Sequence, residues 1–383
     1  MKVFKKGNSL AGLSIFAFLL ALLVIASFAG CEAASLIPVR NKQTPIDNQE
    51  RIAPDATETK ETENEPPAQT EPDPIPESPR FYYPLTGLET TESASVSRPV
   101  AVSFGNTSYA LPQFGIGKTD VLLEFPIENG ATRLVMVTTS YASLEKIGGI
   151  RSTRKYVSDV VAAFDAIEVY AGTSDVSASV LFEGRDTLDY LTQNLGSLCY
   201  RDTSRIMPHN LMTTGSLISS EIGKLGYRTT IGEGYTAPYS FPAAGERIPA
   251  GNEPASEISI SFSATQNAAF SYHSETGVYV RSQLGEKTVD GIDGSSLSFT
   301  NLIVLSSDCA TYESESGSEF SLLLRGGKGK LITDGTARDV LWTMENGVFS
   351  LLDADGNRLC VNRGTTYIAF VRVSDQNALK VIR

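Results

Sequence analysis

The stretch between Glu32 and Arg80 limits where this chain can fold. It holds nine of the 18 prolines and 11 carboxylates against five basic residues, and it has no aromatic residue. Such a segment has too little apolar surface to bury to offset the entropy lost when its backbone is ordered. We therefore expect residues 31–80 to form a disordered tether that spans about 40 Å if it behaves as a flexible coil. Folded structure is expected only after it.

The segment before the tether has the order of an export signal. Lys2, Lys5 and Lys6 precede an uncharged apolar run over residues 10–30, as in a secretory leader. Small residues directly before Cys31 resemble a bacterial lipobox, in which the cysteine is acylated and becomes the mature N-terminus. We interpret residues 1–30 as a lipoprotein signal peptide and Cys31 as the lipidation site. The alternative is an uncleaved membrane helix, since the run is just long enough to span.

These signals predict an extracytoplasmic protein, held on the outer face of a bacterial cytoplasmic membrane by the lipid on Cys31. The net charge is −12, and it becomes −15 without the predicted signal peptide. A chain this acidic is a poor partner for nucleic acid. The sequence gives no indication of the oligomeric state.

No cofactor or metal site is predicted. Cys199, Cys309 and Cys360 are too far apart for metal-binding or redox spacing and are expected to be buried thiols. The glycine-rich segment 326–330 lacks the Gly-Lys-Ser/Thr of a phosphate loop, so a β-turn is expected. Residues 353–357 lack the ligands of a calcium loop and predict a hairpin turn.

The folded part begins with a pattern of strands and helices. Strands are expected at 99–104, 120–125, 133–139 and 166–170, and helices at 152–164, 174–182, 187–195 and 215–225. The helix at 152–164 carries an apolar face at helical spacing, with Ser152 as its N-cap. Gly226 is expected to end the last helix. This alternation predicts an α/β domain over residues 81–235 with a mixed or partly parallel sheet.

A different pattern follows a glycine- and proline-rich connection at residues 236–256. From residue 257 to 383 short apolar runs alternate with Gly and Asp turns. The pattern predicts a second, all-β domain with a sandwich or barrel-like architecture.

Several motifs resemble those of the YerB-like family of bacterial lipoproteins. They are YPLTGL at 83–88, Thr132-Arg133, GGIRSTR at 148–154, Arg201-Asp202 with Arg205, Pro208-His209-Asn210, and YVRS at 279–282 ahead of NLIV at 301–304. The resemblance covers about residues 82–373. It implies an exported α/β domain joined to a β domain, without an established activity. Two departures are informative: Tyr170 stands where the family usually has a histidine, and Gly149 stands where it usually has a proline.

Five arginines in motif positions form the candidate binding site. Arg151 and Arg154 lie three residues apart at the expected start of a helix, where two cations oppose the helix dipole unless an anion offsets them. Guanidinium groups bind phosphate or carboxylate with two parallel hydrogen bonds, and a Gly-Gly turn would add free backbone N–H groups. The predicted ligand-binding residues are Arg133, Gly148, Gly149, Arg151, Ser152, Arg154, Arg201 and Arg205.

Three functions remain open at this point. The leading hypothesis is a lipid-anchored protein that binds an anionic cell-envelope polymer or a small anion. The second is an envelope enzyme for phosphoryl or acyl transfer, with His209 as a general base oriented by Asp202. The third is a protein-interaction scaffold in which the arginines pair internally with Glu124, Glu128, Asp165 or Asp202.

Overall fold

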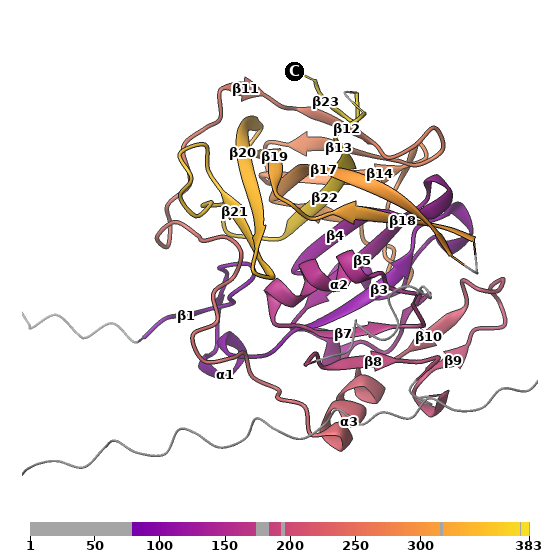
Figure 1. Cartoon of the computed structure of the whole chain (residues 1–383). Helices are drawn as coiled ribbons and strands as arrows, with labels where there is room; N and C mark the ends of the chain where they lie inside the picture. The colour runs from indigo at the N-terminus through magenta and orange to yellow at the C-terminus, as the bar shows by residue number, and fades with distance from the viewer. Residues whose placement is uncertain (1–78, 174–183, 193–195, 315–316, 376, 383) are drawn as a thin grey trace, which may run out of the picture. The chain divides into compact units, whose positions relative to one another are not determined.

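Strands dominate the structure (Figure 1). A computed structural model describes residues 79–382 except 174–183, 193–195, 315–316 and 376. The described N-terminal strands are β1 (Phe81–Tyr82), β2 (Glu89–Thr90), β3 (Val100–Gly105), β4 (Val121–Pro126), β5 (Thr132–Thr138), β6 (Ile147–Gly148), β7 (Ile167–Tyr170), β8 (Thr187–Asp189), β9 (Tyr200–Arg201) and β10 (Leu211–Thr213). The α-helices are α1 (Glu92–Ser95), α2 (Lys155–Val161) and α3 (Gly215–Leu225).

The C-terminal half contains strands and turns only, as far as residues 257–382 are described. Its strands, with β11 just before them, are β11 (Glu253–Pro254), β12 (Glu257–Ser261), β13 (Asn267–His273), β14 (Val278–Gln283), β15 (Glu286–Lys287), β16 (Ser298–Phe299), β17 (Asn301–Ser314), β18 (Gly317–Leu323), β19 (Gly327–Thr333), β20 (Thr336–Glu345), β21 (Val348–Leu352), β22 (Thr366–Arg372) and β23 (Leu379–Ile382). The predicted all-strand C-terminal region is confirmed.

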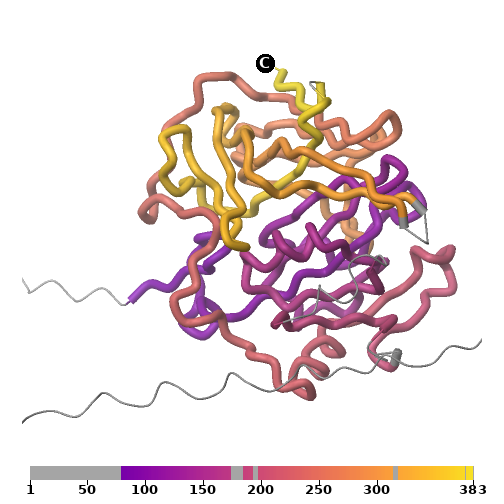
Figure 2. The backbone as a smooth tube through the Cα atoms, viewed as in Figure 1, coloured from indigo at the N-terminus to yellow at the C-terminus, as the bar shows by residue number. Residues whose placement is uncertain are grey.

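A 12-stranded sheet runs through both halves of the chain. Its order is β11-β20-β19-β17-β22-β4-β5-β3-β7-β8, with β18 paired to β17 and β21 to β20. The two halves meet where β22 pairs in parallel with β4, Thr366 lying opposite Val121. Figure 2 shows the yellow C-terminal segment beside the purple N-terminal strands. Because β3 pairs with β5 antiparallel and with β7 parallel, the N-terminal part of the sheet is mixed, as predicted.

A second, six-stranded sheet packs on the C-terminal part of the first. Its order is β15-β14-β13-β12-β23, with β16 paired to β14, and every pairing is antiparallel. Phe270 of β13 and Phe299 of β16 contact Tyr367 of β22, with ring centroids 4.8 and 5.6 Å apart. The two sheets therefore bury one shared apolar layer, as in a sandwich.

Of the three predicted helices that fall on described residues, one begins later than predicted, one is absent and one has the predicted bounds. The apolar face predicted for residues 152–164 is present, since Tyr156, Val157 and Val160 are buried against the large sheet. The predicted N-cap at Ser152 is wrong, because α2 begins at Lys155 and Arg154 occupies the cap position without a side-chain hydrogen bond. Helix α3 matches its prediction, with the Thr214 hydroxyl capping one end and Gly226 in the left-handed conformation at the other.

The helix predicted at residues 187–195 is wrong. Thr187 to Asp189 form the strand β8, which is buried and pairs in parallel with β7. The helix predicted at 174–182 lies outside the described residues. The N-terminal half is thus a mixed sheet with few helices rather than a regular strand-helix alternation.

Smaller predictions have mixed outcomes. Residues 353–357 form a turn in which the Asp353 carboxylate accepts hydrogen bonds from the backbone of Asp355 and Asn357. Gly326 lies in the short connection between β18 and β19 with a φ of 90°, and β19 already begins at Gly327. The three cysteines of the described part, Cys199, Cys309 and Cys360, are half-buried rather than buried.

No helix among the described residues is long and apolar enough to cross a membrane. The apolar run at residues 10–30 and Cys31 lie outside those residues.

Candidate functional site

A tightly packed loop carries the central arginines. Residues 149–154 run from β6 to α2, and the backbone N–H groups of Ile150 and Arg151 donate to Leu211 and Ser103. A Cβ on Gly149 would lie 2.4 Å from the carbonyl oxygen of His209, and one on Gly148 would lie 2.3 Å from the sulfur of Met212. Both positions therefore require glycine.

The expectation of free backbone donors in this loop is wrong for three residues. Gly148 donates its N–H to Phe114, and Ile150 and Arg151 donate theirs to the strands on either side. Arg151 also lies in the loop before α2, so it does not share a helix face with Arg154. An anion here would have to be bound mainly by side chains.

Arg154 is the one predicted site residue that forms a bidentate ion pair. Its Nε and Nη2 atoms donate to the two carboxylate oxygens of Glu128 at 2.9 and 2.7 Å. Burial alone would raise the pKa of Glu128, but the hydrogen bonds and charge of Arg154 hold it below its ordinary value. Ser152 contributes its hydroxyl to the same guanidinium at 3.0 Å. Internal pairing is thus correct for Arg154.

Arg133 is a further positive charge close to the loop at residues 149–154. Its side chain is buried, Nη1 donates to the Phe104 carbonyl at 3.3 Å, and Nε has no hydrogen-bond partner among the described residues. Burial, followed by the charges of Arg154 and Arg151, lowers the pKa of Arg133 to about 9. This guanidinium has no ion pair within the described part of the chain.

Arg151 and Arg201 line one hollow. Its volume is about 150 Å³, and its wall comprises Ile150, Arg151, Ser152, Ala171, Leu191, Arg201, Pro208 and Leu211. Arg201 donates to the side-chain oxygen of Asn210 at 2.9 Å. Asn210 was missed by sequence reasoning, although it belongs to the Pro208-His209-Asn210 motif. Neither guanidinium has a carboxylate within salt-bridge distance among the described residues.

His209 lies against Arg151, whose Nη1 is 3.5 Å from its Nδ1. Because arginine only donates, Nδ1 must act as the acceptor. Burial and the charges of Arg151, Arg133 and Arg205 lower the pKa of His209, so the ring is neutral at pH 7.

Asp202 forms hydrogen bonds with Lys146 and Ser204 rather than with His209. Its carboxylate accepts from the Lys146 ammonium at 2.7 Å and from the Ser204 hydroxyl at 2.6 Å. The Lys146 hydrogen bond, with those of Ser204, holds the pKa of Asp202 below its ordinary value. Within the described part of the chain, no hydrogen bond joins this carboxylate to the His209 ring. The geometry therefore does not support the acid–base pair that the enzyme hypothesis requires.

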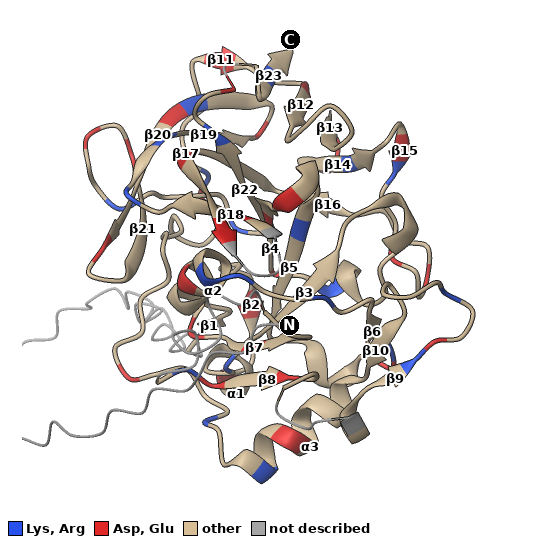
Figure 3. Cartoon of the chain, turned by 45° about the vertical axis from the view of Figure 1, so that its right-hand side comes forward, with Lys and Arg blue, Asp and Glu red and all other residues tan. Residues whose placement is uncertain are grey.

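Arg205 clamps a neighbouring loop. Its guanidinium donates to the carbonyl oxygens of Pro112 at 2.6 Å and of Leu111 at 3.0 Å. It also lies over the Phe114 ring, with its central carbon 5.2 Å from the ring centroid. The hydrogen-bond donors of Arg205 are thus used to bind the loop at Leu111 and Pro112. Arg133 lies on β5 and Arg201 on β9. Figure 3 shows the positions of lysine and arginine along the chain in blue.

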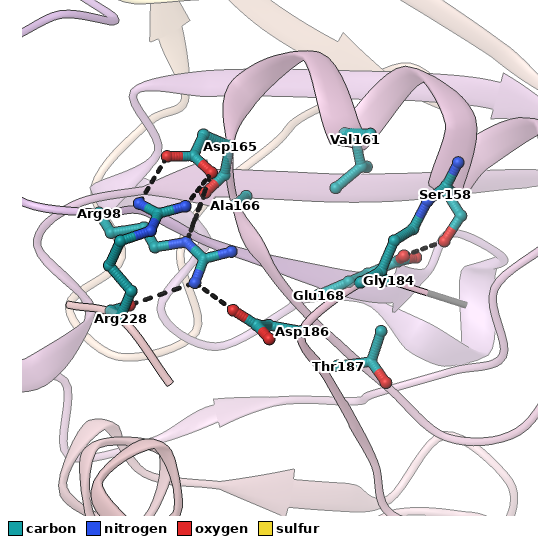
Figure 4. A pocket seen from close by; sticks show the side chains of 12 residues that line it. Arg98, Ser158, Val161, Asp165, Ala166, Glu168, Gly184, Asp186, Thr187 and Arg228 are labelled. Carbon is teal, nitrogen blue, oxygen red and sulfur yellow. Dashed lines mark hydrogen bonds and ion pairs between the residues drawn. The ribbon is translucent and has the colours of Figure 1, made fainter. Parts of the chain in front are cut away.

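A larger hollow, of about 230 Å³, lies beside α2, and its arginines are paired with carboxylates (Figure 4). There the guanidinium of Arg228 pairs with Asp165 at 2.6 Å, and Arg98 lies between Asp165 and Asp186. The positive charges of this hollow are therefore neutralised, and Asp165 is not a partner of the predicted site arginines. Glu168 in its wall is buried, which raises the pKa of this carboxyl group.

The sequence and the fold match known proteins. The model described as "Protein of unknown function (DUF3048) N-terminal domain" matches residues 85–228, and the DUF3048 C-terminal domain matches residues 258–368. A protein of Bacillus subtilis (strain 168) named "Putative lipoprotein YerB" is 28% identical over 300 residues, which are 76% of this chain and 86% of the relative. The crystal structure of YerB from Bacillus subtilis aligns with a TM-score of 0.69 at 26% identity, and the alignment covers 79% of this chain and 100% of that chain.

Proposed function

This chain belongs to the DUF3048 family of two-domain proteins of unknown function, and on that premise we propose that it binds an anionic cell-envelope ligand through Arg151 and Arg201. The ligand is a phosphate- or carboxylate-bearing polymer or small anion. The protein acts outside the cytoplasm and is held to the membrane by its N-terminus.

Uncompensated positive charge carries this proposal. Arg151 and Arg201 face one hollow, and Arg133 is buried without an ion-pair partner in the described part of the chain. Burial, followed by the charges of Arg154 and Arg151, lowers the pKa of Arg133, so keeping this guanidinium group charged carries a cost. An anion in the hollow would offset that cost, and guanidinium groups match phosphate and carboxylate oxygens in shape and charge. Because the chain as a whole has a net charge of −12, this group of arginines is a local positive region on an acidic protein.

Replacing Arg151 or Arg201 with Gln should weaken anion binding about tenfold, since one charge-assisted hydrogen bond is lost. Binding of poly(glycerol phosphate), a phosphodiester polymer, is measured by calorimetry at low and high salt. The affinity of each variant should also depend less on salt, because a screened contact has been removed.

The matched control is Arg247→Gln. This change removes the same charge from the exposed Arg247–Asp334 pair in the C-terminal half, and the affinity should stay at the wild-type value. Polyglutamate is tested in the same way as a carboxylate polymer. The proposal is wrong if the wild type binds neither poly(glycerol phosphate) nor polyglutamate. It is also wrong if the Arg151, Arg201 and Arg247 variants all lose affinity equally.

The lipid anchor is a second part of the proposal. It is supported by the small residues before Cys31 and by the name of the Bacillus relative. Intact-mass analysis of the protein extracted from membranes should give a chain that begins at Cys31 and carries acyl groups. A chain that retains Met1 and has no acyl group would favour the uncleaved membrane helix.

A further inference from the structure

Large exposed apolar side chains lie in the wall of the arginine hollow or beside residues next to that wall. Ile206 and Met207 are consecutive exposed residues in the turn between β9 and β10, next to Pro208 in the wall of the hollow. Leu191 is exposed and lines the hollow itself. The exposed Tyr109 stacks on His209, with ring centroids 6.5 Å apart. We call Tyr109, Leu191, Ile206 and Met207 the apolar rim.

A soluble polyanion would account for the arginines but not for this rim. Apolar residues that gather on a soluble protein's surface around a polar centre mark a surface that is covered in use. The rim and the arginines together combine apolar side chains with positive charge. That combination is what binds proteins to the interface of an anionic bilayer, where tyrosine and aliphatic groups enter the headgroup region and arginines contact phosphates.

The rest of the chain favours the same occupant. The apolar run and Cys31 are expected to hold the N-terminus at the membrane, with residues 32–80 as the only connection to the folded part. A tether with an average span of about 40 Å keeps any face of the folded part near the bilayer. Binding that would be weak for a free protein is then effective, because the second contact becomes intramolecular.

We propose that the apolar rim docks on the anionic phospholipid surface of the membrane, with lipid phosphates in the hollow between Arg151 and Arg201. This inference rests on the proposed function and names the source of the anion. Arg151 and Arg201 supply positive charge in this hollow, and the carboxylate of Asp202 is paired with Lys146.

Two tryptophan reporters test the docking in the full chain. Ile206 and Val348 are both 61% exposed, but Ile206 is in the apolar rim and Val348 begins β21, which is attached to the large sheet through β20. The only native tryptophan, Trp342, is buried and is common to both variants. Each full-length variant is reconstituted into vesicles through its own N-terminus, and fluorescence quenching by a doxyl-labelled phospholipid is measured.

In vesicles that contain phosphatidylglycerol, the Ile206→Trp reporter should be quenched about twofold more than Val348→Trp, because only the first enters the interface. In vesicles of phosphatidylcholine alone the two should be quenched equally. Adding Arg151→Gln and Arg201→Gln to the Ile206→Trp chain should remove the difference in anionic vesicles.

Equal quenching of both reporters in anionic vesicles overturns the docking, as does a difference that persists without anionic lipid. The same preparations are titrated with poly(glycerol phosphate) and with polyglutamate. Equal quenching with retained binding of either polymer overturns the docking alone and leaves the proposed function standing. Equal quenching without binding of either polymer overturns both.

Discussion

Replacing Arg281 with Met should lower the free energy of unfolding by about 3–5 kcal/mol, because it leaves a carboxylate buried without its cation. Arg281 of β14 donates to the Glu124 carboxylate of β4 at 2.9 Å, and both side chains are fully buried. Tyr367 of β22 donates to the same carboxylate oxygen at 2.7 Å. Burial and then the Glu124 charge raise the pKa of Tyr367 well above its ordinary value, so the phenol stays a donor.

A double-mutant cycle separates this pair from its surroundings. Urea unfolding is measured for Arg281→Met, Glu124→Met and the double variant. The double variant should lose less stability than the two single losses added together, since neither charge is then left alone. The control is Arg247→Met, whose exposed pair with Asp334 should be worth about 1 kcal/mol or less. Additive losses would mean that the two groups do not stabilise each other.

Replacing Arg154 with Gln should cost about 3 kcal/mol of stability, the lower end of the range for breaking a buried ion pair. Its bidentate partner Glu128 would remain mostly buried, with 15% of its side chain exposed. Replacing Arg151 with Gln should cost less than about 1 kcal/mol, because no carboxylate loses its partner. Thermal unfolding of both variants, at one protein concentration and one pH, measures the contrast.

A second substitution, at Glu128, tests why Arg154→Gln should lose more stability than Arg151→Gln. If the loss in Arg154→Gln arises from a stranded carboxylate, adding Glu128→Gln to that variant should restore part of the stability. An equal, small loss for Arg151→Gln and Arg154→Gln would mean that the ion pair contributes nothing and that Arg154 is free to bind a ligand.

Four strands of the N-terminal half, β3, β4, β5 and β7, could be predicted because they are buried and mostly apolar. They have no exposed position, so their sequences are apolar segments with few polar residues. The error at residues 187–195 has a physical cause. Leu188, Leu191 and Leu195 are spaced three and four apart, which imitates a helix face. Pairing with β7 instead makes β8 a strand, and sequence spacing does not record that neighbour.

The sequence motifs named the arginines of the candidate site but not their charge partners. Two of the five, Arg151 and Arg201, line one hollow, and the charge of Arg151 contributes to the lowered pKa of Arg133. Which arginine pairs internally depends on contacts between distant segments. Arg154 meets Glu128 across 26 positions, and Glu124, considered as a partner for the site, is taken by Arg281 across 157. Local sequence patterns carry no information about such pairs.

The apolar rim was not predicted either. Ile206 and Met207 are ordinary core-type residues in the sequence, and only the structure shows that the turn between β9 and β10 exposes them.

The parallel pairing of β22 with β4 has a consequence for how the chain is made. Strand β22 lies between β17 and β4 in the large sheet, yet it is synthesised long after β4. Until it arrives, β4 and β17 each have an open edge, and open edges pair readily with other chains. The large sheet is therefore completed only after β22 has been made, and contacts of such long sequence separation form slowly. The chain is thus most exposed to aggregation in the interval between the synthesis of β4 and the pairing of β22 with it.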